Sequence, residues 1–235
     1  MDGGRSGIVG LMTDSDYAQL SFGLAEFADN PEPRCPVLLL LDTSGSMDGE
    51  KIRQLNEGLQ DFQRDLANDA LAAKRCEIAV VSFGPVREVM DFTSAEHFHA
   101  PTLKAEGATP LGEAVTRGLE LLRQRKEIIR QNGIGLYRPW VFLITDGGPT
   151  DAWKQAAASV QQGEASKSFA FFSVGVVGAD MEMLRKLNPA REPVPLRGTD
   201  FRGMFQWLSA SLKSVSQSTP GDAVALTSPK GWAEL

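Results

Sequence analysis

The sequence predicts an α/β fold, a doubly wound and mostly parallel sheet of six strands with helices on both faces. Short aliphatic runs alternate along the chain with longer segments of helical spacing, a pattern typical of such sheets. The run at 37–41 is continuously aliphatic, which indicates a strand buried on both faces. Right-handed crossovers between parallel strands place helices on both sides of the sheet. The 235 residues suffice for one domain with a full core.

The first half of the chain contains a strand, a long helix and a hairpin. The strand at 37–41 ends in a polar turn, and from Lys51 apolar residues recur every three or four positions to about Ala73, which predicts a single helix. The runs at 78–83 and 86–92 are separated only by Gly84 and Pro85. This spacing predicts a hairpin whose second strand is an antiparallel edge strand.

The second half continues the alternation after a loop at about 93–109. We expect a helix from Pro110 to the Asn132-Gly133 stop signal, a strand at 141–145, a helix from near Asp151, a strand at 169–177, a short helix at 181–187, an edge strand at 194–196, and a last helix capped by Asp200 and running to about 215.

The expected organisation is an N-terminal extension at 1–34, one domain at 35–216 and an irregular tail at 217–235. The extension carries apolar residues at helical spacing near 17–27, which predicts a short helix. Such a helix would dock on a partner groove, fold back onto the domain, or be the remnant of a misassigned start.

Composition excludes several classes of protein. The net charge of −6, the isoelectric point near 5.1 and the lack of a basic stripe argue against nucleic-acid binding. The first twenty residues hold no apolar stretch of the length that a signal peptide or membrane helix needs, so we expect a cytoplasmic protein. Cys35 and Cys76 lack metal-ligand spacing and are expected to be reduced core thiols.

Two polar turns follow two of the predicted strands. Asp42-Thr43-Ser44-Gly45-Ser46 follows the first strand, and Asp146 follows the strand at 141–145. Ligands of doubly wound sheets bind beyond the carboxyl ends of the strands, where the strand order reverses. If these strands are neighbours there, the two turns converge, and Gly45 lets the first one curl so that its side-chain oxygens face one point.

The oxygen-bearing side chains of these turns, together with one from the preceding loop, suit a small hard cation. The candidate ligands are Asp42, Ser44, Ser46, Thr109 and Asp146. With so few carboxylates, Mg²⁺ or Mn²⁺ is preferred over Ca²⁺. Neutral hydroxyl ligands leave the ion electrophilic, and the positive end of the following helix favours an anion. We therefore expect a partner's Asp or Glu to complete the coordination octahedron.

The DTSGS turn at 42–46, Thr109-Pro110 and the TDG sequence at 145–147 together resemble the von Willebrand factor A domain family. They match that family's metal-ion-dependent adhesion site at every position, and the resemblance covers about residues 35 to 215. It implies a non-enzymatic interaction module that grips a partner protein through its bound divalent cation.

Within that superfamily, the segments at 30–36, 138–151 and 231–235 resemble the TerY-type proteins of bacterial tellurium-resistance and stress-response clusters. This narrower resemblance implies a cytosolic protein of a phosphorylation-signalling system. Its partners would be a serine/threonine-type kinase and a PP2C-type phosphatase, with the metal site as the docking point.

Apolar residues flank the expected ion. Met47, Pro149 and Trp153 are candidates for the rim of an interface, where Met and aromatic side chains are enriched, although each would also fit local packing. His97 and His99 lie in a polar segment and are assigned no role.

Other interpretations of the first turn are weaker. A phosphatase similar to the haloacid dehalogenases would use Asp42 as nucleophile, but the usual second aspartate, the general acid, is replaced by Ser44. A metal-carrying or metal-sensing protein could use the same ligands, but so few carboxylates would release the ion readily. A plain helix cap would leave Thr109 and Asp146 unexplained.

Overall fold

The computed structural model describes residues 26–222, 224, 228, 229 and 231–234, and divides into two units, 1–31 and 32–235. In the first unit, residues 26–29 are helical, and the rest of the helix expected near 17–27 lies outside the described residues. The fold described below is that of the second unit.

A six-stranded sheet forms the centre of this unit, with the strand order β3-β2-β1-β4-β5-β6. The strands are β1 (Cys35–Asp42), β2 (Cys76–Phe83), β3 (Arg87–Ser94), β4 (Trp140–Thr145), β5 (Ala170–Gly175) and β6 (Val194–Pro195). All neighbouring pairs are parallel except β2 and β3, which are antiparallel. The predicted fold class is thereby confirmed. Strand order reverses between β1 and β4, so the two polar turns emerge side by side.

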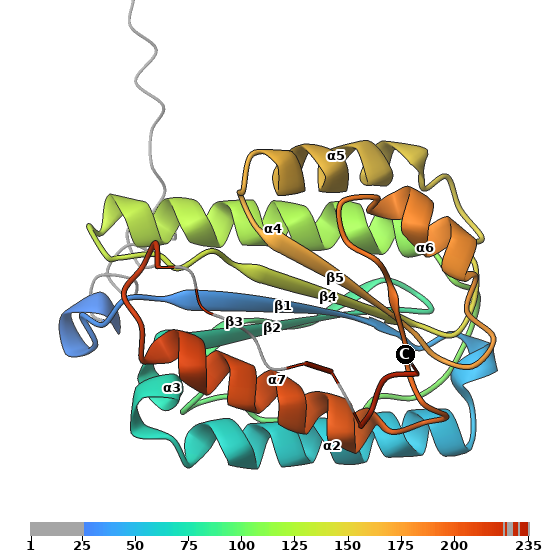
Figure 1. Ribbon diagram of the computed structural model, residues 1–235, viewed down its shortest axis with the longest axis horizontal. Helices are drawn as coiled ribbons and strands as arrows, with labels where there is room; N and C mark the ends of the chain where they lie inside the picture. The colour runs from blue at the N-terminus through green and yellow to red at the C-terminus, as the bar shows by residue number, and fades with distance from the viewer. Residues whose placement is uncertain (1–25, 223, 225–227, 230, 235) are drawn as a thin grey trace, which may run out of the picture. The chain divides into compact units, whose positions relative to one another are not determined.

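Helices cover both faces of the sheet (Figure 1). One face carries α4 (Leu111–Gln131), α5 (Lys154–Ala165) and α6 (Met181–Leu187), and the other carries α2 (Glu50–Ala67), α3 (Ala70–Arg75) and α7 (Phe201–Ser216). A short 3-10 turn, η1 (Gly45–Met47), precedes α2.

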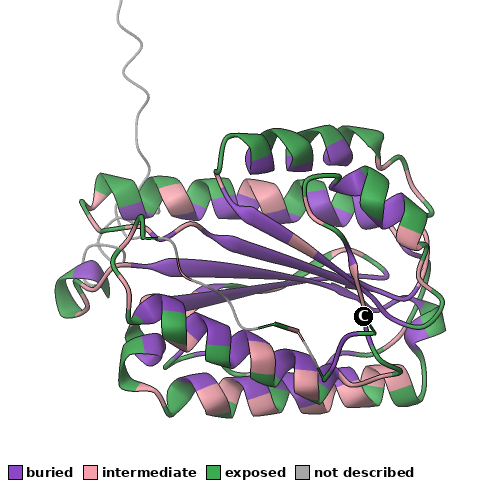
Figure 2. Cartoon of the chain, in the orientation of Figure 1, coloured by how far each residue is buried: buried purple, intermediate pink, exposed green. Residues whose placement is uncertain are grey.

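Alternate residues of the central strand enter different cores. Leu39 and Leu41 of β1 pack with the α2 and α7 side, whereas Leu38 and Leu40 pack with the α4 and α5 side. Figure 2 shows the helices buried along one stripe, and the four central strands, β2, β1, β4 and β5, are buried almost throughout. The site described below therefore stands on a rigid, doubly covered sheet.

The expected single helix from Lys51 to Ala73 is wrong. The structure has two helices, because the side chain of Asp69 accepts hydrogen bonds from the amides of Leu71 and Ala72 and so caps a new helix. The apolar spacing continues across this break, which is why the sequence pattern hides it.

The helix expected from near Asp151 begins later, at Lys154. The Asp151 carboxylate instead accepts hydrogen bonds from the amides of Gly112, at 2.9 Å, and Glu113, at 2.8 Å. It thus caps the first turn of α4, whose own N-cap, Pro110, offers no side-chain acceptor.

Cys35 and Cys76 are free, buried thiols that pair in register across β1 and β2, as expected of core cysteines. The hydrogen bond with Cys35, together with burial, raises the pKa of Cys76 well above its usual value. In the tail, Ala233 forms an isolated bridge with Leu196. Among the described residues, no helix combines the length and hydropathy that crossing a membrane requires.

Candidate metal centre

Asp42 is the last residue of β1, and its side chain is fully buried. One carboxylate oxygen, Oδ1, accepts a hydrogen bond from the Ser44 amide at 2.8 Å, and Oδ2 accepts one from the Thr145 hydroxyl at 2.5 Å. The parallel register of β1 and β4 places Thr145 beside Asp42. The carboxylate is therefore held by its own turn and by the end of the neighbouring strand.

A chain of hydrogen bonds joins the first turn to Asp146. The hydroxyl oxygens of Ser44 and Ser46 lie 3.0 Å apart, and the Ser46 hydroxyl donates to Asp146 Oδ1 at 2.7 Å. The Asp146 side chain is itself buried. Two turns that are 100 residues apart in sequence thus share one hydrogen-bonded cluster.

The loop before α4 brings Thr109 to the same place. A Cβ atom built on Gly147 would lie 3.9 Å from the buried Thr109 hydroxyl oxygen. The Thr109 backbone exchanges hydrogen bonds with Thr150, and the Gly45 amide donates to the Gly107 carbonyl at 3.0 Å. Hydrogen bonds therefore join the Asp42 turn to Asp146, and Thr109 lies beside the turn that contains Asp146 and Gly147.

Lys51, in the first turn of α2, also enters the site, and sequence reasoning missed it. Its ammonium group donates to Asp146 Oδ2 at 2.5 Å, to the Val177 carbonyl at 3.1 Å and to the Ser46 carbonyl at 3.3 Å. The side chain is 25% exposed. The only signal in the sequence is that Lys51 lies five residues after Ser46, at the start of the following helix.

The negative charges of the two carboxylates of the site are not neutralised equally by nearby cations. Lys51 pairs with Asp146, whereas no cation contacts Asp42 among the described residues. Burial raises the pKa of Asp42, hydrogen bonds from Ser44 and Thr145 lower it in part, and the charge of Asp146 raises it further. A buried carboxylate in this state favours an added cation.

The donor set suits a hard divalent ion held through hydroxyl oxygens. Within the described part of the chain, no group of three or more His, Cys, Asp or Glu side chains is placed to hold a metal ion. Two carboxylates and three hydroxyls instead converge here, and oxygen ligands of this kind are those that Mg²⁺ and Mn²⁺ accept.

The expected apolar rim is only partly present. The prediction for Met47 is wrong, because this side chain is fully buried in the core between the sheet and α2. Pro149 and Trp153 are half-buried and stay candidates. The exposed apolar side chain next to the site is Val177, which is 60% exposed and whose carbonyl binds Lys51.

Comparison with known proteins agrees with this architecture. The von Willebrand factor type A domain model matches residues 37–206. The chain is 32% identical over 124 residues to the pig (Sus scrofa) inter-alpha-trypsin inhibitor heavy chain H4, a match that covers 48% of this chain and only 12% of that protein's length.

Two solved structures illustrate the shared fold. The pilus adhesin SpaC from Lactobacillus rhamnosus GG, in its open conformation, matches with a TM-score of 0.61 and 13% identity, over 79% of this chain and 31% of SpaC. The manganese-loaded TRAP protein of Plasmodium vivax matches with a TM-score of 0.53 and 16% identity, over 75% of this chain and 73% of TRAP. Such low identities bear on the fold alone, but the family model spans most of the chain. The chain therefore belongs to the von Willebrand factor type A domain family.

Proposed function

We propose that this protein is a non-enzymatic interaction module that binds an Asp or Glu of a partner protein through a divalent cation. The ion would be held by Asp42, Ser44, Ser46, Thr109 and Asp146. The observation that carries the proposal is the grouping of these oxygens, from three segments, around a buried carboxylate that no cation contacts within the described part of the chain. Membership of a family of protein-interaction and adhesion modules supports it.

The chain's own groups set the properties of such a site. Thr145 and the Ser44 amide fix the Asp42 carboxylate. Lys51 neutralises Asp146 and so limits the negative charge that the ion meets. The bound ion supplies an electrophilic position for one outside carboxylate. With few direct charges, ion and partner should bind weakly alone and strengthen one another together.

Magnesium or manganese is the proposed ion. Hydroxyl-rich oxygen sites with few carboxylates favour the smaller ions over calcium. The structural neighbour TRAP was solved loaded with manganese, which supports the same choice here.

The biological setting that we propose rests on the resemblance of 30–36, 138–151 and 231–235 to TerY-type proteins. In that setting the chain acts in the cytosol beside a serine/threonine-type kinase and a PP2C-type phosphatase of a stress-response or tellurium-resistance system. One of these enzymes would present the carboxylate.

A phosphatase that uses Asp42 as nucleophile is disfavoured because Ser44 stands where such an enzyme carries its second aspartate, the general acid. A metal carrier is disfavoured because Lys51 already neutralises one of the two carboxylates.

A pull-down from native lysate tests the docking proposal. The wild-type protein should capture its partner in Mg²⁺ and lose it in excess chelator, and Asp42→Asn should capture nothing. Asp48→Asn is the matched control, because Asp48 is an exposed carboxylate just beyond the serine turn and should bind as wild type does. Equal capture by Asp42→Asn in chelator would refute the proposal, and phosphatase turnover that disappears in this variant would support the enzyme instead.

A further inference from the structure

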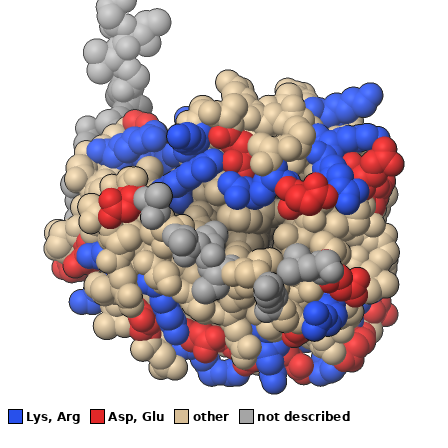
Figure 3. Space-filling view, viewed as in Figure 1, with Lys and Arg blue, Asp and Glu red and all other residues tan. Residues whose placement is uncertain are grey.

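A second site lies at the opposite end of the sheet, where β4 and β5 begin. A cleft of about 680 Å³ opens there between the last turns of α4, the end of α5 and the segment after α7. Its cationic lining residues are Lys126, Arg130, Arg138, Lys167 and Arg191. Asp222 is the one acidic residue among its described lining residues. Figure 3 shows Lys and Arg side chains along one border of a hollow on this face. Such a concentration of positive charge is notable in a chain of net charge −6.

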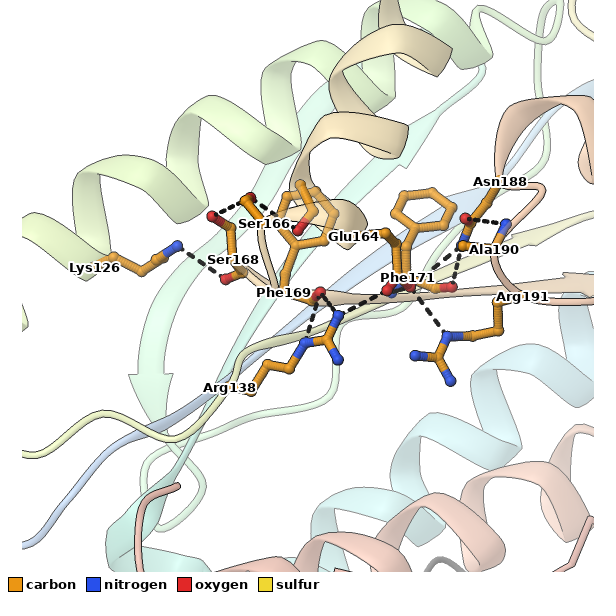
Figure 4. Close-up of polar contacts among 11 residues, drawn as sticks. Lys126, Arg138, Glu164, Ser166, Ser168, Phe169, Phe171, Asn188, Ala190 and Arg191 are labelled. Atoms are coloured by element: carbon orange, nitrogen blue, oxygen red, sulfur yellow. Dashed lines mark hydrogen bonds and ion pairs between the residues drawn. The ribbon is translucent and has the colours of Figure 1, made fainter. Parts of the chain in front are cut away.

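One buried carboxylate fixes two of these arginines. Glu164, whose side chain is 5% exposed, accepts from Arg138 Nη2 at 2.7 Å and from Arg191 Nε at 3.0 Å. Figure 4 shows the two guanidinium groups on either side of Glu164. Burial opposes ionisation of Glu164, but the hydrogen bonds from Arg191 and the Phe171 amide and the charges of both arginines hold its pKa below the usual value. One negative charge thus orients two positive ones, and a unit of positive charge is left over.

Both arginines keep donors for a ligand. Arg138 Nε donates to the Phe169 carbonyl at 2.9 Å, which leaves Nη1 without a hydrogen bond inside the described part of the chain. Arg191 lies 4.6 Å from the centre of the Phe172 ring, and neither of its Nη atoms makes a hydrogen bond within that same part. The side chains are 36% and 35% exposed. Each guanidinium is therefore fixed on one side and open on the other.

Lys126, Lys167 and Arg130 add further positive charge to the cleft. Lys126 donates to the Ser168 carbonyl at 2.9 Å, and its pKa is lowered first by burial and then by the charge of Arg130. The side chains of Arg130 and Lys167 are exposed and make no ion pair or hydrogen bond to any described residue. The hydroxyl oxygens of Ser166 and Ser168 lie 3.0 Å apart, and the Ser166 hydroxyl donates to the Gly163 carbonyl at 3.3 Å. The cleft thus concentrates positive charge and also carries two hydroxyl groups.

We infer that this cleft binds a phosphate group carried by an extended peptide segment of a partner protein. A phosphate monoester carries up to two negative charges and three strong acceptor oxygens, which suits several fixed donors better than a single carboxylate would. The hollow opens to solvent, whereas small ligands are usually enclosed over most of their surface. The apolar lining residue Leu136 is partly exposed and offers a contact for a side chain that flanks the phosphate.

Fluorescence anisotropy on the full chain tests this inference. The probes are a labelled peptide with one phosphoserine among small apolar residues and the same peptide unphosphorylated. The phosphorylated form should bind at least about tenfold more tightly, with an affinity that falls as salt is raised and that chelator leaves unchanged. Because chelator should not affect phosphopeptide binding, this experiment tests the cleft separately from the proposed metal-dependent site. Either proposal can therefore be refuted without the other.

Substitutions in the cleft test whether the phosphopeptide binds there. The double variant Arg130→Gln/Lys167→Gln removes two exposed charges that pair with no described residue, and it should weaken phosphopeptide binding about tenfold without affecting stability. The control Lys104→Gln/Lys154→Gln removes two exposed lysines elsewhere and should leave the affinity unchanged. Asp222→Asn should strengthen binding a few-fold, because it removes an acid from the cleft.

Three outcomes would overturn the inference. They are equal affinity for the phosphorylated and unphosphorylated peptides, an equal loss in the cleft variant and its control, and tighter binding of a mononucleotide or an anionic lipid vesicle than of the phosphopeptide.

Discussion

Replacing Asp42 by Asn should make the metal-free protein more stable while it removes metal binding. The carboxylate is fully buried, accepts two hydrogen bonds and has its pKa raised by burial. An Asn side chain has the same shape, still accepts from the Ser44 amide, and can donate its amide to the rotated Thr145 hydroxyl. The substitution therefore removes the charge and keeps the contacts.

The magnitude follows from the cost of burying an incompletely compensated charge. Relief of that cost should raise the free energy of unfolding in chelator by roughly 1–3 kcal/mol. For a chain of this size, this corresponds to a rise in Tm of about 2–12 °C. In Mg²⁺ at about 100 times its Kd the wild type gains roughly 2.7 kcal/mol by mass action, and the variant gains nothing. In Mg²⁺ the wild type should therefore be as stable as the Asp42→Asn variant, or more stable.

The effect of pH on the stability of the metal-free wild type has a defined sign. Because the pKa of Asp42 is raised in the folded protein, the folded state holds this proton more tightly than the unfolded chain does. The wild type therefore loses stability as pH rises from the unfolded pKa, near 3.8, through the raised folded pKa. The difference in free energy of unfolding between variant and wild type should be largest at neutral pH. It should disappear as pH falls through the folded and unfolded pKa of Asp42.

Urea unfolding followed by circular dichroism, in chelator and in excess Mg²⁺, measures both effects. A variant that is less stable than wild type in chelator would refute the reasoning, because it would mean that the ionised carboxylate stabilises the empty site. Asp48→Asn is the control, with stability unchanged in both conditions.

Three further predictions concern neighbouring features. Lys51→Met removes the ammonium group from Asp146 and should tighten Mn²⁺ binding by about 1 kcal/mol, or roughly fivefold, in calorimetry; weaker binding would instead assign Lys51 a supporting role. Asp69→Ala removes the cap of α3 and should lower the free energy of unfolding by about 1 kcal/mol in urea titrations, whereas an unchanged value would contradict the capping role. Glu77→Gln removes the buried negative charge that pairs with Arg34 and Arg125 and should cost roughly 3–5 kcal/mol in the same titrations, and a loss below 1 kcal/mol would contradict the importance of these two ion pairs.

The fold and the position of the site could be predicted because both depend on local patterns. Aliphatic runs, helical spacing and turn residues identify most elements, and a doubly wound sheet brings the carboxyl ends of neighbouring strands together. Asp42 and Asp146 each follow such a strand, so their convergence needs only the order of the strands. Thr109 is a candidate because its hydroxyl comes from the loop before the next helix, and the resemblance to the family supports this assignment.

The errors arise where a side chain acts on a distant element. Asp151 caps α4 across 39 residues, so its place in the sequence falsely indicated the start of α5. Met47 lies next to the serine turn but points into the core, since η1 turns its side chain inward. Lys51 reaches Asp146 across 95 residues, a contact that no local pattern indicates.

The arginine pair around Glu164 was missed for a related reason. Arg138 lies just before β4, Glu164 on α5 and Arg191 after α6, and the sequence shows them only as scattered charges. Their grouping depends on how the helices cover the sheet.

The most direct test of the central claim is anomalous diffraction from a crystal soaked in Mn²⁺. The oxygens of Asp42, Ser44, Ser46, Thr109 and Asp146 should surround a single strong anomalous peak, with an outside oxygen completing its coordination. A saturating soak that leaves this position without a peak, in a crystal whose Asp42 and Asp146 turns are undisturbed, would contradict the metal site and the docking function built on it.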